Sequence, residues 1–342
     1  MIYGHGDDSY RYGDKIRIDF SSNVYRKTDH SELKEHLMRH FDVIKRYPEP
    51  EPRELEQMLA QKLGISAGRI MVTSGVTDAI YLLAQHYQGW ASVIPQPTFN
   101  EYTDACKLFG HIISYDSNDE LEQLPQHRLY WLCNPNNPTG NTLLKTLVRY
   151  IITRQDKYIY ILDQSYEDYT LSNMIRPKET VDLHNVITLH SMSKKYCVPG
   201  LRLGYITASP IIIERLRRLR QPWAVGALEI EAGKYLTEHN TKAIPNLKEY
   251  LEEAARLHAE LAATDGLMVM HSDTNFMLVN IDIGESQELK HFLIDRYGIL
   301  IRDASNFHGL DNHCFRIAAQ QPEENNELVS AIKDYIEWRR NR

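Results

Sequence analysis

Between residues 53 and 210, short apolar runs rich in β-branched and aromatic residues alternate with segments of helical periodicity. This alternation is typical of an α/β protein with a mainly parallel sheet between helices, because parallel strands need a crossover connection. Residues 76–87 are predicted as a helix that buries Ile80, Leu83 and Ala84 on one face. Six runs are predicted as strands or strand ends: 69–75, 91–97, 128–135, 158–165, 186–191 and 203–209.

After residue 210 the pattern changes to longer charged helices, predicted over 246–263 and 323–340, with strand-like runs between them. This part is typical of an α+β fold, and we expect the N-terminal forty residues to join it in a smaller domain. The predicted organisation is therefore residues 1–42 and 236–342 in the small domain and residues 43–235 in the large domain.

Composition narrows the class of ligand. The formal net charge of −7 gives no basic field for a phosphate backbone, so a small-molecule substrate is expected and nucleic acid is not. The four cysteines form no Cys-x-x-Cys pair, and no metal site is predicted. The N-terminus lacks a signal-peptide pattern, and no apolar run approaches the roughly 20 residues of a membrane span. A cytoplasmic protein that does not bind membranes is expected.

In open α/β sheets, ligands bind beyond the carboxyl ends of the strands, so the residues after each apolar run are the candidates. Gly75, Val76 and Thr77 follow one strand and open a helix, whose free N–H groups can bind a phosphate; an ordinary helix cap is the alternative. Residues 134–140, which include Asn137, form a turn that can present amides to a ligand.

A carboxylate, Asp163, ends another buried strand and is followed by Tyr166. A carboxylate in this position is costly unless a cation pairs with it, although a helix cap is again the simpler alternative.

Residues 190–205, "HSMSKKYCVPGLRLGY", place two lysines directly after an apolar run and an arginine in a Gly-Leu-Arg turn. A desolvated lysine is a nucleophilic amine suited to Schiff-base chemistry, and Arg202 can bind a phosphate; a solvated loop is the alternative. A phosphate anchor, a buried acid, amide and hydroxyl donors and a lysine are together what pyridoxal 5'-phosphate requires.

With these motifs the chain resembles the class I and II aminotransferases, which are pyridoxal-phosphate enzymes, over nearly its whole length. The stretch "SMSKKYCVPGLRLGY" is similar to their Ser-x-Ser-Lys and Gly-Leu-Arg-x-Gly segments. The resemblance implies that Lys194, not Lys195, is the catalytic Schiff-base lysine, and that Asp163 pairs with the pyridine nitrogen. It also implies that Tyr166 and Asn137 donate to the ring's 3'-oxygen. The phosphate is expected to contact Ser191, Arg202, Gly75, Val76 and Thr77.

Two aromatic residues complete the implied cofactor site. In "PQPTFNEY", Phe99 matches the residue that stacks on the ring. In "RYPEPEPRELEQMLA", Tyr47 matches the tyrosine that reaches the phosphate of a partner subunit, which implies a homodimer with shared active sites.

The segment "GILIRDASNFHGLDNHCFRIAAQQPEEN" resembles the branch that holds histidinol-phosphate aminotransferases and threonine-phosphate decarboxylases. The resemblance implies that Arg316 binds the substrate's anionic group and that Arg302 helps to bind a phosphorylated substrate. "YGHGDD" and "IDFSSNV" are similar to threonine-phosphate decarboxylases, so His5 and Asn23 are further substrate-binding candidates.

The N-terminus departs from that pattern, since Asp7 and Asp8 replace a Gly-Asn pair and Val24-Tyr25 stands where an Asn-Pro turn is expected. Two carboxylates beside a phosphate site would repel the phosphate unless they point away.

The sequence thus predicts a pyridoxal-phosphate enzyme for a small phosphorylated amino acid or amine, with threonine-phosphate decarboxylase favoured. A histidinol-phosphate-type or broader amino-acid aminotransferase is the alternative, and a non-catalytic cofactor-binding sensor is a remote one.

Overall fold

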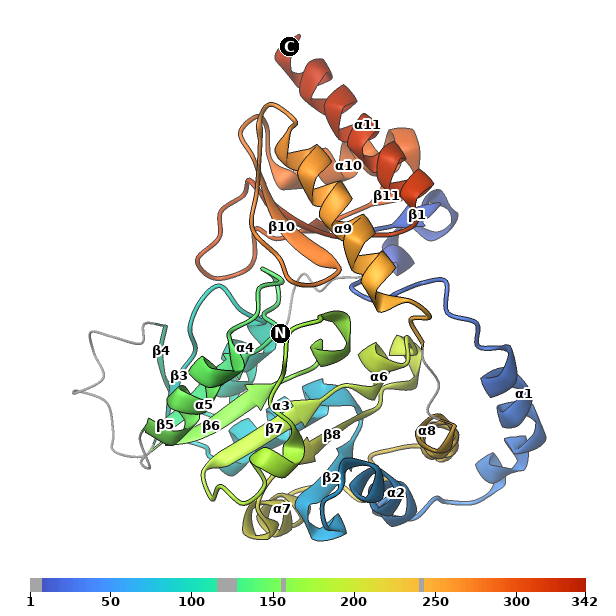
Figure 1. Cartoon of the computed structure of the whole chain (residues 1–342), viewed down its shortest axis with the longest axis vertical. Coiled ribbons are helices and arrows are strands. Elements are labelled where there is room, and N and C mark those ends of the chain that lie inside the picture. Colours follow the sequence, from blue (N-terminus) through green and yellow to red (C-terminus); the bar gives the residue numbers. More distant parts are fainter. Residues whose placement is uncertain (1–7, 116–127, 155–157, 240–242) are drawn as a thin grey trace.

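The computed structural model describes residues 8–115, 128–154, 158–239 and 243–342 and has two parts, each built on its own sheet (Figure 1). The larger part holds a seven-stranded sheet, and the smaller part holds a four-stranded sheet that is covered by the C-terminal helices. The predicted α/β fold class is confirmed.

In the large sheet, β8 runs antiparallel to both of its neighbours, while the other neighbouring strands are parallel. All six predicted strands are present, whereas β4 was not predicted because it is a three-residue strand at the sheet edge. In sheet order the strands are β2 (Ile70–Thr73), β8 (Gly204–Thr207), β7 (Val186–His190), β6 (Tyr158–Asp163), β5 (Arg128–Cys133), β3 (Ala91–Val93) and β4 (Ile112–Ser114).

Both faces of this sheet are buried, which explains why its strands read as continuous apolar runs. In β2, Met71 packs into one core with the helix that contains Ile80 and Leu83, while Ile70 and Val72 pack into a second core. This period-two alternation gives three layers, helices over sheet over helices. The helices of this part are α2 (Arg53–Leu63), α3 (Gly75–His86), α4 (Asn100–Leu108), α5 (Lys145–Arg154), α6 (Met192–Lys195), α7 (Pro210–Arg217) and α8 (Ala227–Glu238).

The smaller part has its own core between an antiparallel sheet and three long helices. The sheet order is β12 (Arg302–Asp303), β13 (Cys314–Ala318), β10 (Phe276–Ile281) and β9 (Leu267–Val269). The helices are α9 (Leu247–Ala262), α10 (Ser286–Tyr297) and α11 (Pro322–Arg340). The predictions of helices over 246–263 and 323–340 are therefore confirmed.

The N-terminal segment contacts both parts. Strand β1 (Ile18–Asp19) pairs in parallel with β11 (Ile299–Leu300) of the C-terminal region, whereas helix α1 (Ser31–Arg39) packs against α8. The boundaries after residues 42 and 235 stay predictions. Short 3-10 helices span Ser9–Arg11, Gly13–Lys15, Phe41–Lys45 (η3), Ala67–Arg69, Glu167–Tyr169, Pro177–Glu179 and Pro199–Leu201.

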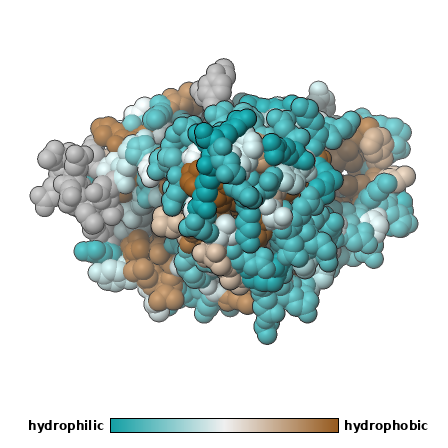
Figure 2. Space-filling view, turned by 90° about the horizontal axis from the view of Figure 1, so that it is seen from above, coloured by the Kyte–Doolittle hydropathy of each residue, from teal (hydrophilic) through white to brown (hydrophobic). Residues whose placement is uncertain are grey.

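Seen from the α11 end, the surface is mainly hydrophilic with separate apolar patches (Figure 2). Within the described ranges, no helix combines the length and apolar character that crossing a bilayer requires.

Candidate active site

A cavity of about 420 Å³ lies where the carboxyl ends of β6 and β7 and the N-terminus of α3 face the small sheet. Most of the residues that the sequence singled out line it, although they come from positions spread over nearly 300 residues. They are Asn23, Gly75, Val76, Thr77, Phe99, Asn137, Asp163, Tyr166, Ser191, Lys194, Arg202 and Arg316.

One end of the cavity is built to receive an anion. Gly75, the first residue of α3, has a φ of +77°, and a Cβ there would lie 2.7 Å from Arg202 Nη2. A Cβ on Gly204 would lie 3.0 Å from the backbone of Gly75 and Val76, so glycine also lets β8 pass close beneath this turn. The first-turn N–H groups and the guanidinium therefore converge on one point, as anion sites at helix N-termini do.

The two adjacent lysines point to different places. Lys194 lines the cavity, and its Nζ lies 5.7 Å from the centroid of the Tyr166 ring. Lys195 Nζ instead donates to Asp168 Oδ1 at 3.0 Å, outside the cavity. Ser191 caps α6 by accepting a hydrogen bond from the Lys194 N–H at 3.2 Å, which fixes where the short helix begins. The geometry therefore singles out Lys194 as the lysine available to a ligand.

Asp163 is a buried carboxylate that neutral groups hold in place. Its Oδ1 accepts from Ser165 N at 2.9 Å and from Ser165 Oγ at 2.6 Å, and its Oδ2 accepts from Tyr102 Oη at 2.6 Å. Burial raises the pKa of Asp163, although the hydrogen bonds from Ser165 and Tyr102 oppose that rise. A cation placed at this oxygen pair would stabilise the charged carboxylate.

The opposite wall combines the N-terminal segment with β13. Arg316 Nη2 donates to Ser21 O at 2.8 Å, and Arg316 Nη1 donates to Asn137 Oδ1. Because Oδ1 of Asn137 accepts from the arginine, the amide N–H₂ is the end of that side chain left to donate to a ligand. Asn23 Nδ2 donates to Tyr166 Oη at 3.4 Å.

A second arginine lies directly opposite Arg316 in the sheet. Arg302 on β12 pairs with Arg316 on β13, and both side chains are buried. Arg302 does not line the cavity; its Nη2 donates to Asn306 Oδ1 at 2.7 Å. Burial, together with the positive charge of Arg316, lowers the pKa of Arg302 to about 10. Burial also lowers the pKa of Arg316. Two buried guanidinium groups side by side are unfavourable unless an anion joins them.

The N-terminal candidates are placed only in part. His5 and Asp7 lie outside the described residues. Asp8 does not stand as an uncompensated carboxylate, because its Oδ2 accepts from the buried Lys290 Nζ at 2.6 Å. The repulsion expected from Asp8 is therefore largely neutralised.

Tyr47 does not reach the cavity of its own chain. Its side chain is 86% exposed, and its ring lies beside Trp223 at 5.4 Å between centroids, in a separate surface hollow with Ile44 and Leu228. The placement leaves this side chain open to solvent or to a second molecule.

Several lining residues were not assigned from the sequence: Ser21, Ser22, Tyr102, Cys133, Ser165, Ser193, Pro199 and Gly200. Tyr102 lies three residues after Phe99 in a helical segment, and this spacing signals a shared helix face. Ser165 follows Asp163 by two residues, the spacing of a local aspartate turn. Burial raises the pKa of the Cys133 thiol to about 12, so it lines the cavity as a neutral group.

Comparisons with known proteins give a family match and similar chains. A family model described as aminotransferase class I and II matches residues 15–332. The threonine-phosphate decarboxylase of Salmonella typhimurium is 30% identical over 339 residues, covering 93% of this chain and 91% of that protein.

Solved structures are similar to this chain as well. The L-threonine-O-3-phosphate decarboxylase of Porphyromonas gingivalis superimposes with a TM-score of 0.89 at 35% identity, covering 94% of this chain and 99% of that one. The histidinol-phosphate aminotransferase of Sinorhizobium meliloti, solved in complex with pyridoxal-5'-phosphate, has a TM-score of 0.81 at 20% identity, covering 96% and 93%. This last likeness concerns the fold.

Proposed function

This chain belongs to the class I and II aminotransferase family, and we propose that it is a pyridoxal-phosphate enzyme that decarboxylates a small phosphorylated amino acid of the threonine-phosphate type. The observation that carries the proposal is the convergence of Lys194, Asp163 and Arg202 with the buried Arg316 on one cavity. The relatives at 30% and 35% identity, both named threonine-phosphate decarboxylases, support the substrate class.

The residues of the cavity fit the cofactor. A phosphate matches the turn at Gly75, whose φ of +77° favours glycine and whose backbone lies close to the Arg202 guanidinium. A protonated ring nitrogen matches Asp163, whose desolvated carboxylate gains from a neighbouring cation. Phe99 is partly buried and lines the cavity, where it can cover a ring face.

When bound, the cofactor withdraws electrons from the bond that is broken at the substrate's α-carbon. We assign Lys194 to hold the cofactor covalently and, once released, to move a proton at that carbon. Asp163 keeps the ring nitrogen protonated, and the hydroxyl of Tyr166 and the free N–H₂ of Asn137 donate to the ring oxygen.

Arg316 and Arg302 are assigned to the anionic groups of the substrate. They fix its orientation, and orientation decides whether the carboxylate or a proton is lost from the α-carbon. His5, which lies outside the described residues, and Asn23 are proposed to complete the site for the substrate's phosphate. The ion pair between Asp8 and Lys290 keeps one carboxylate of the N-terminal segment from opposing it.

We also propose that the active protein is a homodimer in which Tyr47 serves the partner's cavity, which accounts for a large aromatic side chain that is 86% exposed in one chain. A cytoplasmic location is proposed as well. Four free, buried cysteines support it, since a reducing compartment keeps thiols in that form.

The test is product analysis by mass spectrometry. Purified, cofactor-loaded protein is given threonine phosphate with and without 2-oxoglutarate, and Lys194→Ala serves as the inactive control. Loss of carbon dioxide that does not depend on the keto acid supports the decarboxylase. No reaction with threonine phosphate, but glutamate from histidinol phosphate plus 2-oxoglutarate, would replace it with the aminotransferase alternative.

A further inference from the structure

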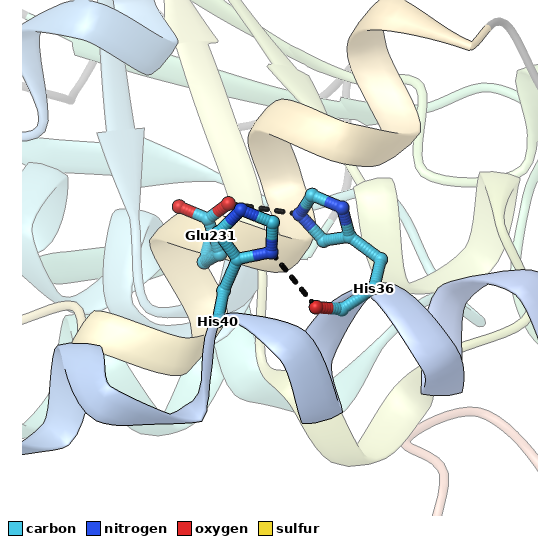
Figure 3. Close-up of side chains that lie close together, drawn as sticks. All are labelled: His36, His40 and Glu231. Carbon is cyan, nitrogen blue, oxygen red and sulfur yellow. Dashed lines mark hydrogen bonds and ion pairs between the residues drawn. The ribbon is translucent and has the colours of Figure 1, made fainter.

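A cluster of metal-binding side chains lies away from the cavity, between helices α1 and α8. His36 and its neighbour His40 come from α1 and its C-cap, and Glu231 comes from α8 (Figure 3). Among the described residues, this is the group of histidines and acids whose three ligand atoms all lie within 4.8 Å of one another. The proposed enzyme does not use it.

Secondary structure brings the three side chains together. Residues 36 and 40 are four apart, so their imidazoles project from the same side of the helix. The two rings stack at 4.2 Å between centroids, and the Tyr235 ring lies 4.5 Å from the His36 ring at a tilt of 35°. The His36 ring thus contacts two other rings.

The hydrogen bond of His40 leaves the other nitrogen of its ring for a ligand. His40 Nδ1 lies 2.9 Å from the His36 carbonyl oxygen, which can only accept, so Nδ1 carries the proton and the Nε2 lone pair of a neutral ring is free for a metal. Such a hydrogen bond from the non-ligating nitrogen to a backbone carbonyl is the usual way in which proteins orient a metal-binding histidine.

Glu231 supplies a negative charge. Its Oε1 lies 2.8 Å from His36 Nε2, and its Oε2 lies 3.1 Å from Lys234 Nζ.

The spacing suits a tetrahedral ion. Bonds of about 2.0 Å from Zn²⁺ to nitrogen and oxygen place neighbouring ligand atoms roughly 3.3 Å apart. The 2.8 Å between His36 Nε2 and Glu231 Oε1 is about half an ångström shorter than that value, and all three ligand atoms lie within 4.8 Å of one another. Two imidazoles with one carboxylate suit zinc and not the hard cations Mg²⁺ and Ca²⁺, which prefer oxygen ligands.

We propose that His36, His40 and Glu231 bind Zn²⁺, with solvent as the fourth ligand, and that the ion ties helix α1 to helix α8. Zn²⁺ takes the place of the proton that His36 Nε2 donates to Glu231 Oε1; a neutral ring keeps that proton on Nδ1, and a charged ring releases it to solvent. The chain continues from α1 through η3 to Tyr47, so the ion anchors the start of the segment that carries this tyrosine. The proposal concerns a structural ion and does not depend on the reaction in the cavity.

The first experiment is isothermal titration of metal-stripped, tag-free full-length protein with ZnCl₂. We expect one equivalent of Zn²⁺ per chain, and a loss of affinity of about 100-fold or more in His40→Ala and in Glu231→Gln. His40 is exposed and Glu231→Gln is nearly isosteric, so both variants should keep the fold, which their melting temperatures without metal check.

The matched control is His239→Ala. His239 stacks on Tyr235 at 4.1 Å, in the same row of rings, but its Nδ1 bonds to the Tyr235 carbonyl and it is not among the three ligands. This variant should bind Zn²⁺ as wild type does. Equal loss of affinity in His239→Ala and His40→Ala would overturn the proposed ligand set.

Two further readouts are independent of catalysis. At a Zn²⁺ concentration about 100 times Kd, the Tm of wild type should rise by roughly 5 °C, and that of His40→Ala should not change. X-ray absorption at the zinc edge should show nitrogen and oxygen ligands with imidazole scattering. Sulfur ligation, or the absence of a stoichiometric ion, would refute the site.

Discussion

Two buried charged regions of opposite sign lie one on each sheet, and each places a residue, Asp163 or Arg316, in the cavity wall. The first, which we call the carboxylate floor, is Asp163 at the end of β6 with its donors Ser165 and Tyr102. The second, the arginine pair, is Arg302 on β12 opposite Arg316 on β13. Neither charge is a main influence on the pKa of the other region. Each charge is desolvated, and neither is neutralised by the other.

The difference between the two regions suggests a division of work. Asp163 of the carboxylate floor is proposed to keep the cofactor's ring nitrogen protonated, so changes there should act on the chemical step. The arginine pair belongs to the small sheet and is proposed to hold the substrate's anionic groups, while Arg316 also donates to Asn137 Oδ1. Changes there should act on substrate binding, and kinetic parameters can separate the two effects.

The largest effect is expected from Lys194→Ala on the floor side. Without the amine that holds the cofactor and moves the proton, kcat should fall by about 10⁴-fold, and the visible absorbance of the lysine-linked cofactor should disappear. Lys195→Ala is the control, because its Nζ is paired with Asp168 outside the cavity. Turnover that survives in Lys194→Ala, or is lost in Lys195→Ala, would reverse the assignment.

Asp163→Asn should come next, with a loss in kcat of about 10²-fold to 10³-fold, as expected when one partner of a buried ion pair is removed. Asparagine can still accept from Ser165, so local geometry should survive.

The pH dependence of the folding stability of Asp163→Asn provides the sharper test. Burial raises the pKa of Asp163, so folded protein holds the proton more tightly than unfolded chain does. Ligand-free wild type should therefore lose stability relative to the variant as pH rises through that raised pKa.

Calorimetry of both ligand-free proteins at several pH values measures this difference. Asp163→Asn would instead destabilise the ligand-free protein increasingly at higher pH if Asp163 already had a cationic partner. That result would contradict the assignment of Asp163 as an unpaired carboxylate that the cofactor's ring nitrogen stabilises.

The arginine pair should show the opposite kinetic pattern. Arg316→Met should raise KM for the phosphorylated substrate by about 100-fold and Arg302→Met by about 10-fold, with smaller changes in kcat, because hydrogen bonds to charged groups contribute about 1.5–3 kcal/mol. Steady-state kinetics with threonine phosphate measures both. If kcat fell in the arginine variants while KM stayed unchanged, the arginine pair would act on the chemical step as the carboxylate floor does, and the proposed distinction would be wrong.

Ligand-free stability again gives an independent check. Because burial and Arg316 lower the pKa of Arg302 to about 10, the charged side chain costs the folded protein stability at neutral pH, and that cost decreases as pH rises through 10. Arg302→Met should therefore melt at the same temperature as wild type or higher at pH 7, even though it binds substrate less well.

The floor and the pair also differ in how far sequence could predict them. Lys194, Asp163 and Gly75 each stand at a strand end or a helix start, so short motifs identify them, and all three line the cavity. Arg302 and Arg316 face each other only through strand register, which no single segment encodes. Their substrate-binding roles were expected by resemblance, whereas their pairing was not predicted.

Contacts between distant segments could not be predicted. The hydroxyl of Tyr102 reaches Asp163 across two elements 61 residues apart, and Asp8 meets Lys290 across 282 residues. The six strands with buried faces were found because continuous apolar runs mark them, whereas β4 has only three residues at an edge. His36 and His40 did carry a helical spacing, but Glu231 had no sequence signal that linked it to them.

The smallest single-residue effect is expected at Tyr47. This residue belongs to neither the carboxylate floor nor the arginine pair, and its proposed contact is made between two chains. Tyr47→Phe removes a hydroxyl proposed to reach the phosphate in the partner's cavity, so cofactor affinity should fall by about tenfold, in line with one hydrogen bond to a charged group. Phe41→Ala, another exposed aromatic nearby, serves as the control.

Mixing subunits distinguishes a shared site from a local one. In a hybrid of Lys194→Ala and Tyr47→Phe subunits, one cavity has Lys194 from its own chain and Tyr47 from the partner, and the other cavity has neither. Turnover per hybrid at limiting cofactor should therefore exceed that of either parent. If Tyr47 acted within its own chain, the only cavity with Lys194 would still lack the hydroxyl, and mixing would restore nothing.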